Sequence, residues 1–485
     1  MDLWDGCFSF LLANMRVSRH YMKTKKLLIT NIILSVVLLA MLCFCLFIVI
    51  DIREAEASEG RYSALKDGEG TKAEVTTSQY SHVKNIREFG SSFSGSDSDV
   101  TTIMVYLNGC NLESDGGCAT EDLREMVKAE RSDQVNIVVQ TTSTKEWERY
   151  NIASDRSQRY LVTEDGVELV CDNLGQTDVT APEPLSDFIS WTAKEYPADR
   201  YIMILWNHGG GSVDGYGYNE WGRASDALTI DEMQDAFGSA GVYFDIIGFD
   251  ACIMSSLEVC YSLYDYCDYM IVSEDFESGL GWYYTDFLTE LARNPGMDTV
   301  SLGKLIVDDM VKKNEENRYG CESTLALIDE RYIPELFNEW KEFAYDAEEE
   351  LLHVNYSREV VRSSRAMNRD QDLKSASEME DYYITDLMAL ASSVNSNEAK
   401  TLINALKKAI VYYNYTDDDK GLTGMFVTIP YDNISFYRNM KGIYIKAGID
   451  RDYIMWLKKF ADIDSNEISY YDYGEFESSW DGWDN

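Results

Sequence analysis

Two short apolar runs, each ending in a reactive side chain, constrain this chain more than any other feature of its sequence. Residues 201–208 read YIMILWNH and precede three glycines, and residues 244–252 read FDIIGFDAC. Runs of this length are typical of parallel strands that helices cover on both faces. Because open α/β sheets place their chemistry at the carboxyl ends of strands, we expect His208 and Cys252 to meet at one edge of a sheet.

Residues 100–330 alternate apolar strand patterns with amphipathic helix patterns. This alternation predicts an α/β fold in which helices flank a mainly parallel sheet. We expect strands at 102–107, 135–141, 201–206, 245–249, 269–273 and 324–328, and helices at 120–130, 185–195, 230–238, 253–264 and 302–314. Residues 331–462 are predicted to form a helical C-terminal region without an assigned role, with helices at 333–352, 382–393, 398–413 and 450–460 and one strand at 425–429.

A thiol and an imidazole at the same edge of a sheet can act together, the thiol as a nucleophile and the imidazole as the group that exchanges a proton with it. Of the four histidines, His208 is the one that follows a strand pattern. Each residue also has a simpler explanation, since an isolated histidine can be a core residue and free cysteine is often buried. The pattern at 253–264 predicts a helix that begins directly after Cys252, and its N-terminus would lower the thiol pKa from its usual value of about 8.5.

Three segments resemble the signature blocks of clostripain-type cysteine peptidases, peptidase family C11. They are ILWNHGGG at 204–211, IIGFDACIMSSLEV at 246–259 and DYMIVSEDFESGLGWYY at 268–284. The similarity extends from Thr101 to Asp329 and weakens beyond it. An HGGG loop also occurs in esterases, but those enzymes need a Gly-x-Ser-x-Gly elbow that this sequence lacks.

The resemblance implies a caspase-like fold and a cysteine endopeptidase. It implies that Cys252 is the nucleophile and that His208 protonates the leaving amine. The backbone N–H groups of Gly209 and Cys252 would then form the oxyanion hole. The alternative considered is an inactive caspase-like module that binds partners at a cell surface.

Asp250 is the main candidate for substrate recognition. If the strand continues, Asp250 and Cys252 point to the same side, where a carboxylate would repel a thiolate unless a cation compensates. A substrate Lys or Arg would supply that cation, and the resemblance implies cleavage after basic residues in an acidic pocket. The alternative for Asp250 is a helix N-cap. Glu274 and Asp275, which follow the next strand, are further candidates for the pocket, with a solvated loop as the alternative.

Arg223 is the single basic residue between His208 and Cys252. It lies in a loop rich in Gly, Tyr and Trp, and exposed loops of this kind are readily cleaved. The family resemblance implies maturation by internal cleavage into two chains. We therefore expect self-processing at Arg223-Ala224, with an ordinary surface arginine as the alternative.

The N-terminal part of the chain contains a candidate membrane segment. Residues 27–50 are 24 consecutive uncharged, mainly aliphatic residues, long enough to cross a bilayer core of about 30 Å. Basic residues precede them and acidic residues follow, so residues 1–26 are predicted to be cytoplasmic and the catalytic domain at 100–330 extracytoplasmic. Residues 51–99 form a polar spacer and 463–485 an acidic aromatic tail. A cleaved signal peptide is the alternative to this single-pass anchor.

Net charge and cysteine content bear on which partners, disulfides and metal sites the protein can have. A net charge of -41 excludes nucleic acid as a partner, since its phosphates require a basic surface. Beyond residue 99 seven of the ten cysteines remain, and setting aside Cys252 leaves six, a number compatible with disulfides. No zinc-site spacing and no EF-hand loop occurs in the sequence, so no cofactor is expected, although some members of the family require calcium.

Overall fold

The computed structural model describes residues 95–222, 227–316, 323–352, 383–416, 421–430 and 433–462. The predicted membrane segment at 27–50, nearly all of the polar spacer, the Arg223-Ala224 bond and the tail at 463–485 lie outside the described residues. Within those residues, no helix combines the length and apolar character that crossing a membrane requires.

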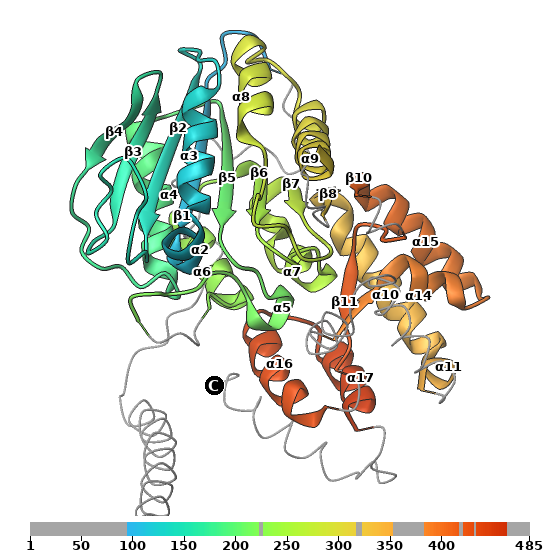
Figure 1. Ribbon diagram of the computed structural model, residues 1–485. Coiled ribbons are helices and arrows are strands. Elements are labelled where there is room, and N and C mark those ends of the chain that lie inside the picture. The colour runs from blue at the N-terminus through green and yellow to red at the C-terminus, as the bar shows by residue number, and fades with distance from the viewer. Residues whose placement is uncertain are drawn as a thin grey trace, which may run out of the picture. The chain divides into compact units, whose positions relative to one another are not determined.

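A sheet of nine strands organises the described part of the chain (Figure 1). Its strands are β1 (Thr101–Asn108), β2 (Val135–Thr142), β3 (Gln158–Thr163), β4 (Gly166–Cys171), β5 (Arg200–Trp206), β6 (Phe244–Asp250), β7 (Cys267–Val272), β8 (Thr324–Asp329) and β10 (Ile410–Tyr415). Their order is β10-β8-β7-β6-β5-β1-β2-β3-β4. The central run from β2 to β7 is parallel, and antiparallel strands extend it at both ends. The six predicted strands of residues 100–330 are therefore confirmed as members of one mainly parallel sheet.

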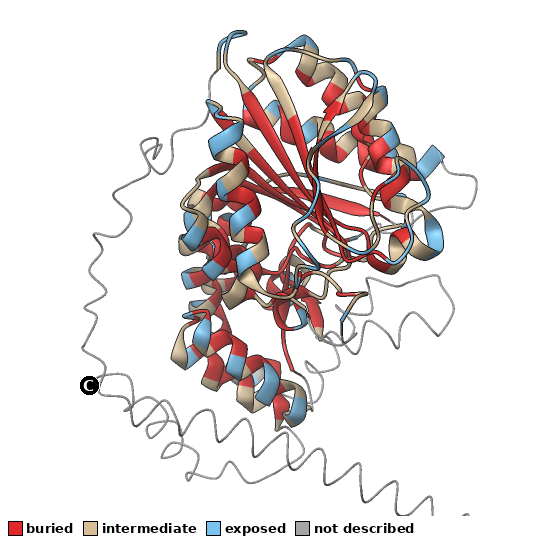
Figure 2. Cartoon of the chain, turned by 90° about the vertical axis from the view of Figure 1, so that its left-hand side faces the viewer, coloured by how far each residue is buried: buried red, intermediate tan, exposed pale blue. Residues whose placement is uncertain are grey.

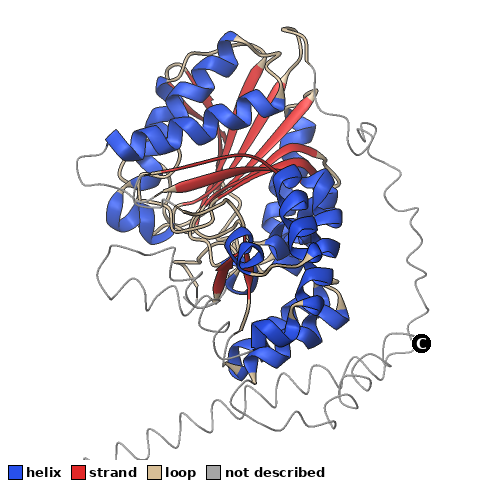
Figure 3. Ribbon diagram, turned by 90° about the vertical axis from the view of Figure 1, so that its right-hand side faces the viewer, coloured by secondary structure: helices blue, strands red, loops and turns tan. Residues whose placement is uncertain are grey.

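Helices cover both faces of this sheet (Figure 3). Those between β1 and β8 are α2 (Cys110–Gly116), α3 (Cys118–Lys128), α4 (Pro182–Glu195), α5 (Gly211–Asp214), α6 (Ile230–Ala240), α7 (Leu257–Leu263), α8 (Tyr284–Arg293) and α9 (Thr299–Glu316). Apolar side chains of α3, α8 and α9 form one core with one face of the sheet, and those of α4, α6 and α7 form another with the opposite face. Because both faces are covered, all eight residues of β1 are buried, and the strands stand out as the buried centre of Figure 2.

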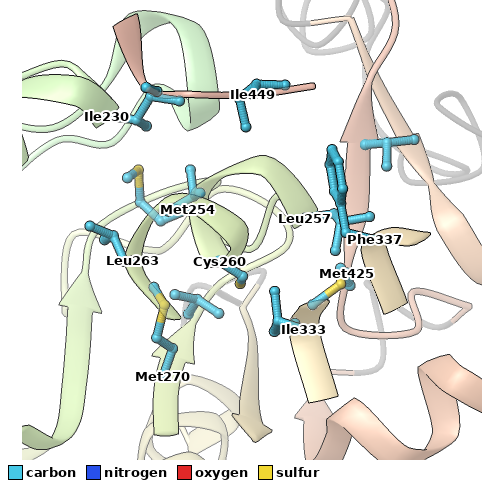
Figure 4. Close-up of a cluster of buried hydrophobic side chains, with 14 of the residues drawn as sticks. Ile230, Met254, Leu257, Cys260, Leu263, Met270, Ile333, Phe337, Met425 and Ile449 are labelled. Carbon is cyan, nitrogen blue, oxygen red and sulfur yellow. The ribbon is translucent and has the colours of Figure 1, made fainter. Parts of the chain in front are cut away.

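Residues after 330 continue the same fold. They form α10 (Ile333–Asp346), α11 (Glu348–Leu352), β9 (Ile384–Asp386), α14 (Leu387–Ser393), α15 (Asn397–Ala409), β11 (Phe426–Thr428), α16 (Ile434–Lys446) and α17 (Arg451–Ala461). β10 pairs with β8, so this region supplies an edge strand to the central sheet. Figure 4 shows Ile333 and Phe337 of α10 and Met425 in one cluster with Leu257 and Cys260 of α7. The predicted division at residue 330 therefore does not divide the sheet or this core.

Several element boundaries differ from the prediction. The helix predicted at 253–264 begins only at Leu257, because Ser256 caps it by accepting a hydrogen bond from the backbone N–H of Val259. The helix predicted at 398–413 ends at Ala409, where the chain IVYYNY begins β10, since β-branched and aromatic residues favour a strand. The sequence did not predict α2, α8, α16, β9 or the antiparallel strands β3 and β4.

Candidate active site

The ends of β5 and β6 bring His208 and Cys252 into the same small region. These strands pair in parallel with Trp206 opposite Asp250, so each candidate residue lies two positions beyond a paired residue. The loops after the strands are in close contact, because a Cβ added at Gly209 would lie 2.0 Å from the backbone oxygen of Cys252. The expected meeting of these two strand ends at one edge of the sheet is therefore confirmed.

The thiol of Cys252 is half-buried and contacts the backbone of Glu277. Its Sγ accepts a hydrogen bond from the Glu277 N–H at 3.2 Å and lies 3.8 Å from the Glu277 carbonyl oxygen. Burial, followed by the nearby Glu277 carboxyl, raises the pKa of Cys252 to about 12. The expected lowering of this pKa by a helix N-terminus is wrong, since α7 begins five residues later at Leu257.

The imidazole of His208 lies between two side chains. Its Nε2 is 3.0 Å from Oδ1 of Asn111, and its ring meets the ring of Tyr218 edge-on at a centroid distance of 6.3 Å. Burial lowers the pKa of His208 below its usual value of 6.5. At neutral pH the ring is therefore uncharged and able to accept a proton.

Two backbone N–H groups beside the thiol are available to a ligand. Among the described residues, neither the N–H of Gly209 nor that of Cys252 donates a hydrogen bond to another residue's backbone. The hydrogen bonds of the glycine loop run instead from Gly217 N–H to His208 and from Gly210 N–H to Gly215. These two N–H groups are the pair expected for the oxyanion hole, and the contact between Gly209 and the backbone oxygen of Cys252 shows that their two loops are adjacent.

Asp250 is the last residue of β6 and is only 4% exposed. Its carboxylate accepts hydrogen bonds from the hydroxyl of Tyr284 at 2.7 Å and from the backbone N–H of Trp282 at 3.2 Å. Burial raises its pKa to about 6, against the lowering effect of these donors. The alternative of a helix N-cap at Asp250 is wrong, because the following helix is capped by Ser256.

Two further carboxyl groups lie near Asp250. Asp122 of α3 accepts a hydrogen bond from the indole of Trp206 at 2.6 Å. Both carboxyl oxygens of Glu277 are buried, and the Glu277 side chain interacts with the carboxyl group of Asp250 and the indole of Trp282. Burial and the Asp250 charge raise the pKa of both groups well above its usual value. No described Lys or Arg is among the groups that shift the pKa of Asp250 or Glu277, so a basic ligand would find two carboxyl groups without a competing cation.

Glu277 was missed by the sequence reading, which named Glu274 and Asp275 of the same loop. The carboxylate of Glu274 is fully buried and accepts hydrogen bonds from the backbone N–H groups of Thr423 and Gly424. The backbone oxygen of Asp275 accepts from the N–H of Ile253, next to the nucleophile. Glu277 belongs to the acidic run SEDFES, which follows β7. This run indicates that an acidic residue is available there, but it does not indicate which of its acids faces Asp250.

The described cysteines and acids give no metal or disulfide site. Cys110, Cys118, Cys171, Cys252, Cys260 and Cys267 are free thiols. In the described ranges, no group of three or more His, Cys, Asp or Glu side chains could hold a metal ion. No step below uses a metal ion.

The chain is similar to known proteins over most of its length. A sequence profile of the clostripain family, Peptidase C11, matches residues 105–483. Clostripain of Hathewaya histolytica is 24% identical over 216 residues, which make up 39% of this chain and 40% of that protein. The match to this relative thus spans about two fifths of its length.

Two solved structures have a similar fold. One is a secreted C11 cysteine protease of Bacteroides thetaiotaomicron in complex with an irreversible peptide inhibitor, with a TM-score of 0.55 and 20% identity over 72% of this chain and 99% of that one. The other is an inactive zymogen C11 protease of Parabacteroides distasonis, with a TM-score of 0.56 and 18% identity over 75% of this chain and 99% of that one. These similarities confirm the predicted α/β fold.

Proposed function

Because the chain belongs to the clostripain family, we propose that it is a cysteine endopeptidase with Cys252 as nucleophile and His208 as its proton partner. The observation that carries this proposal is the register of β5 and β6, which brings the two residues to adjacent loops. The N–H groups of Gly209 and Cys252, which make no backbone hydrogen bond, would provide the donors for an oxyanion.

The resting state favours a mechanism in which the proton moves during attack. The thiol, with its raised pKa, is neutral, and the imidazole of His208 is neutral as well. As Sγ bonds to the scissile carbonyl carbon, its proton passes to the imidazole and the carbonyl oxygen becomes an oxyanion held by the two N–H groups. Collapse breaks the C–N bond, the imidazolium gives its proton to the leaving amine, and water then hydrolyses the thioester.

We extend the proposal to cleavage after Arg or Lys. The supporting observation is the pair of buried carboxyl groups of Asp250 and Glu277, one two residues before the nucleophile and the other in the loop that contacts the thiol. A guanidinium or ammonium would neutralise both, and a buried acidic pair without a cation is costly. Glu274 and Asp275 remain candidates for the pocket, with Glu274 already holding the loop at 423–424.

The test of the reaction is turnover of fluorogenic peptides that end in Arg, Lys or Asp. We expect hydrolysis of the Arg and Lys peptides by the wild type and none by Cys252→Ala or His208→Ala. Cys171→Ala removes a half-buried thiol from edge strand β4 and should keep full activity. Equal turnover by Cys252→Ala would exclude the proposed nucleophile, and a folded wild type without any turnover would favour the inactive binding module, which the neutral, buried thiol would also suit.

Self-processing at Arg223-Ala224 is part of the proposal. Arg223 directly follows the exposed Gly222, between the strand-like positions Tyr216 and Leu228, whose backbones form a bridge. We expect two fragments from the wild type and an intact chain from Cys252→Ala and Arg223→Ala. Arg124→Ala, which removes an exposed arginine of α3, is the control and should still be cleaved. The same fragments from Cys252→Ala would refute self-cleavage.

We also propose that residues 27–50 anchor the protein in a membrane, with the catalytic domain extracytoplasmic. The support is the length of the uncharged run and the basic residues before it. The anchored protein should resist extraction by alkaline carbonate, and external protease should reach the catalytic domain in intact cells. Release by carbonate, or a mature N-terminus beyond residue 57, would favour the cleaved signal peptide instead.

A further inference from the structure

We propose that Asn111 is a positioning residue that holds His208 in the tautomer required to receive the proton of Cys252, an inference that rests on the proposed peptidase function. Asn111 lies in the first turn of α2, directly after β1, and is 97 residues away from His208 in sequence. Its Oδ1 nevertheless lies 3.0 Å from Nε2 of the imidazole. β1 is the neighbour of β5 in the sheet, so the ends of three adjacent strands supply Asn111, His208 and Cys252.

The direction of this hydrogen bond follows from the groups around the amide. The thiol of Cys110 also donates to Oδ1 of Asn111, at 3.0 Å. An amide oxygen can only accept hydrogen bonds, and two donors that converge on it fix the orientation of the amide. Nε2 of His208 therefore carries the hydrogen.

This hydrogen bond determines which ring nitrogen can act as a base. A neutral imidazole has one N–H group and one lone pair, so a hydrogen on Nε2 leaves the lone pair on Nδ1. Nδ1 is then the atom that takes the proton from Sγ of Cys252, and Asn111 still accepts from Nε2–H in the imidazolium that forms. Cys-His-Asn proteases of the papain type use an asparagine in this way, on an unrelated fold.

The chain around Asn111 is built to fix its position. Gly109 is required, because a Cβ there would lie 2.4 Å from Oγ1 of Thr144. The next residue, Cys110, has a φ of 38°, a left-handed conformation that costs energy for a residue with a side chain. Its sulfur accepts a hydrogen bond from Nδ2 of Asn207 at 3.0 Å, which links the end of β5 to Asn111 through the thiol.

The experiment compares Asn111→Ala, Asn111→Asp and the control Asp115→Ala, which removes an exposed side chain one turn further along α2. We expect Asn111→Ala to lower kcat roughly ten- to a hundredfold with little change in KM, since general acid–base catalysis by a well-placed group contributes about 10²–10⁴-fold. Asn111→Asp keeps an oxygen acceptor and should recover most of kcat. Asp115→Ala should match the wild type.

The pH profile separates a positioning role from a purely structural one. The rate at which iodoacetamide alkylates Cys252, followed by mass spectrometry, should rise as His208 loses its proton. A carboxylate at 111 raises the imidazole pKa and should move this rise to higher pH, whereas alanine should move it to lower pH. Iodoacetamide carries no basic group, so this profile does not depend on substrate binding or on peptide turnover.

Different outcomes refute the two proposals. If no peptide is hydrolysed but the alkylation profiles shift in opposite directions, the proposed function fails while the coupling of Asn111 to His208 stands. If peptides are hydrolysed and Asn111→Ala keeps kcat within about twofold of Asp115→Ala, or all three profiles coincide, the positioning role is wrong. If Asn111→Ala does not fold, the positioning role is tested by comparing the alkylation profile of Asn111→Asp with that of the wild type. Coinciding profiles would refute the role.

Discussion

Asp250 carries a carboxyl group whose charge depends on pH within the working range of most enzymes. Its pKa of about 6 follows from burial at the end of β6, only partly offset by the Tyr284 hydroxyl, the Glu277 side chain and the Trp282 N–H. Above this value the group is an anion that a basic substrate residue can pair with, and below it the group becomes neutral. If the proposed specificity holds, the preference for basic residues should therefore depend on pH.

Replacing Asp250 with asparagine should remove the preference for basic residues. We expect kcat/KM for Arg peptides to fall roughly a hundredfold or more, because leaving a buried charge without its partner costs about 2–5 kcal/mol. In the wild type, KM for these peptides should rise as the pH falls through about 6, while the variant should lack this rise. Steady-state kinetics at several pH values measures both effects, and Asp133→Asn at an exposed position is the control. Unchanged specificity in the variant would place the basic residue elsewhere.

At the level of elements, the contact between the loops after β5 and β6 leaves no room for a side chain at position 209. A Cβ there would meet the Cys252 backbone oxygen at 2.0 Å and Cγ of Met254 at 3.0 Å. Gly209→Ala should therefore separate the loops and displace an oxyanion donor, with a loss of roughly 10²–10³-fold in kcat. Turnover of an Arg peptide checks this, with Gly279→Ala, which has open space around it, as the control. Full activity in Gly209→Ala would contradict the close packing of the two loops.

Helix α7 carries a buried acid that should make stability depend on pH. Glu258 is fully buried, accepts a hydrogen bond from the Tyr453 hydroxyl at 2.7 Å and has a pKa raised by burial to about 7. The folded chain thus holds this proton more tightly than the unfolded chain does. Stability should fall as the pH rises from about 4.5 to about 7, by up to about 3 kcal/mol.

Glu258→Gln should remove this contribution, since the amide does not titrate. Thermal unfolding at about pH 5 and about pH 8 measures the difference in Tm for wild type and variant, which should be smaller in the variant. Glu168→Gln on the exposed face of β4 is the control. An identical pH dependence in both proteins would show that Glu258 does not contribute to it.

The elements also show how far the sequence could predict this structure. Continuous apolar runs predicted the central strands and the shared edge at which the strands before His208 and Cys252 end, because strand ends are local features and parallel strands share an edge. The contact of Asn111 with His208 and the approach of Glu277 to Asp250 were not predictable, since each depends on the order of strands in the sheet. The start of α7 was predicted too early, because apolar spacing continued through a loop whose boundary is set by the cap at Ser256.

At the scale of the whole molecule, residues after 330 complete the site as well as the sheet. β11 approaches the nucleophile loop through a hydrogen bond from the Phe426 N–H to the Ser255 carbonyl. Phe426 and Ile384 of the β9–β11 pair form an apolar cluster with Ile253, against which Cys252 packs. This region was predicted without a role, because nothing in its sequence indicates that its strands return to the end of β6.

The net charge of -41 should affect how substrates reach the site. A strongly negative surface attracts cationic peptides at low ionic strength, and salt screens this attraction. We expect kcat/KM to fall with added salt, and to fall more steeply for a peptide with extra lysines remote from the cleaved bond than for one with a single arginine. Initial rates at several salt concentrations measure the two slopes. Equal slopes would show that the surface charge does not steer substrates.

Covalent labelling of the thiol tests the pairing of Cys252 with His208 most directly. The measurement is peptide mapping after reaction with an irreversible acyloxymethyl ketone whose peptide ends in arginine. Label should appear on Cys252, should be lost in His208→Ala and should be absent with the matching aspartate probe. Label on another cysteine, or undiminished labelling of Cys252 in His208→Ala, would contradict the joint action of the two side chains.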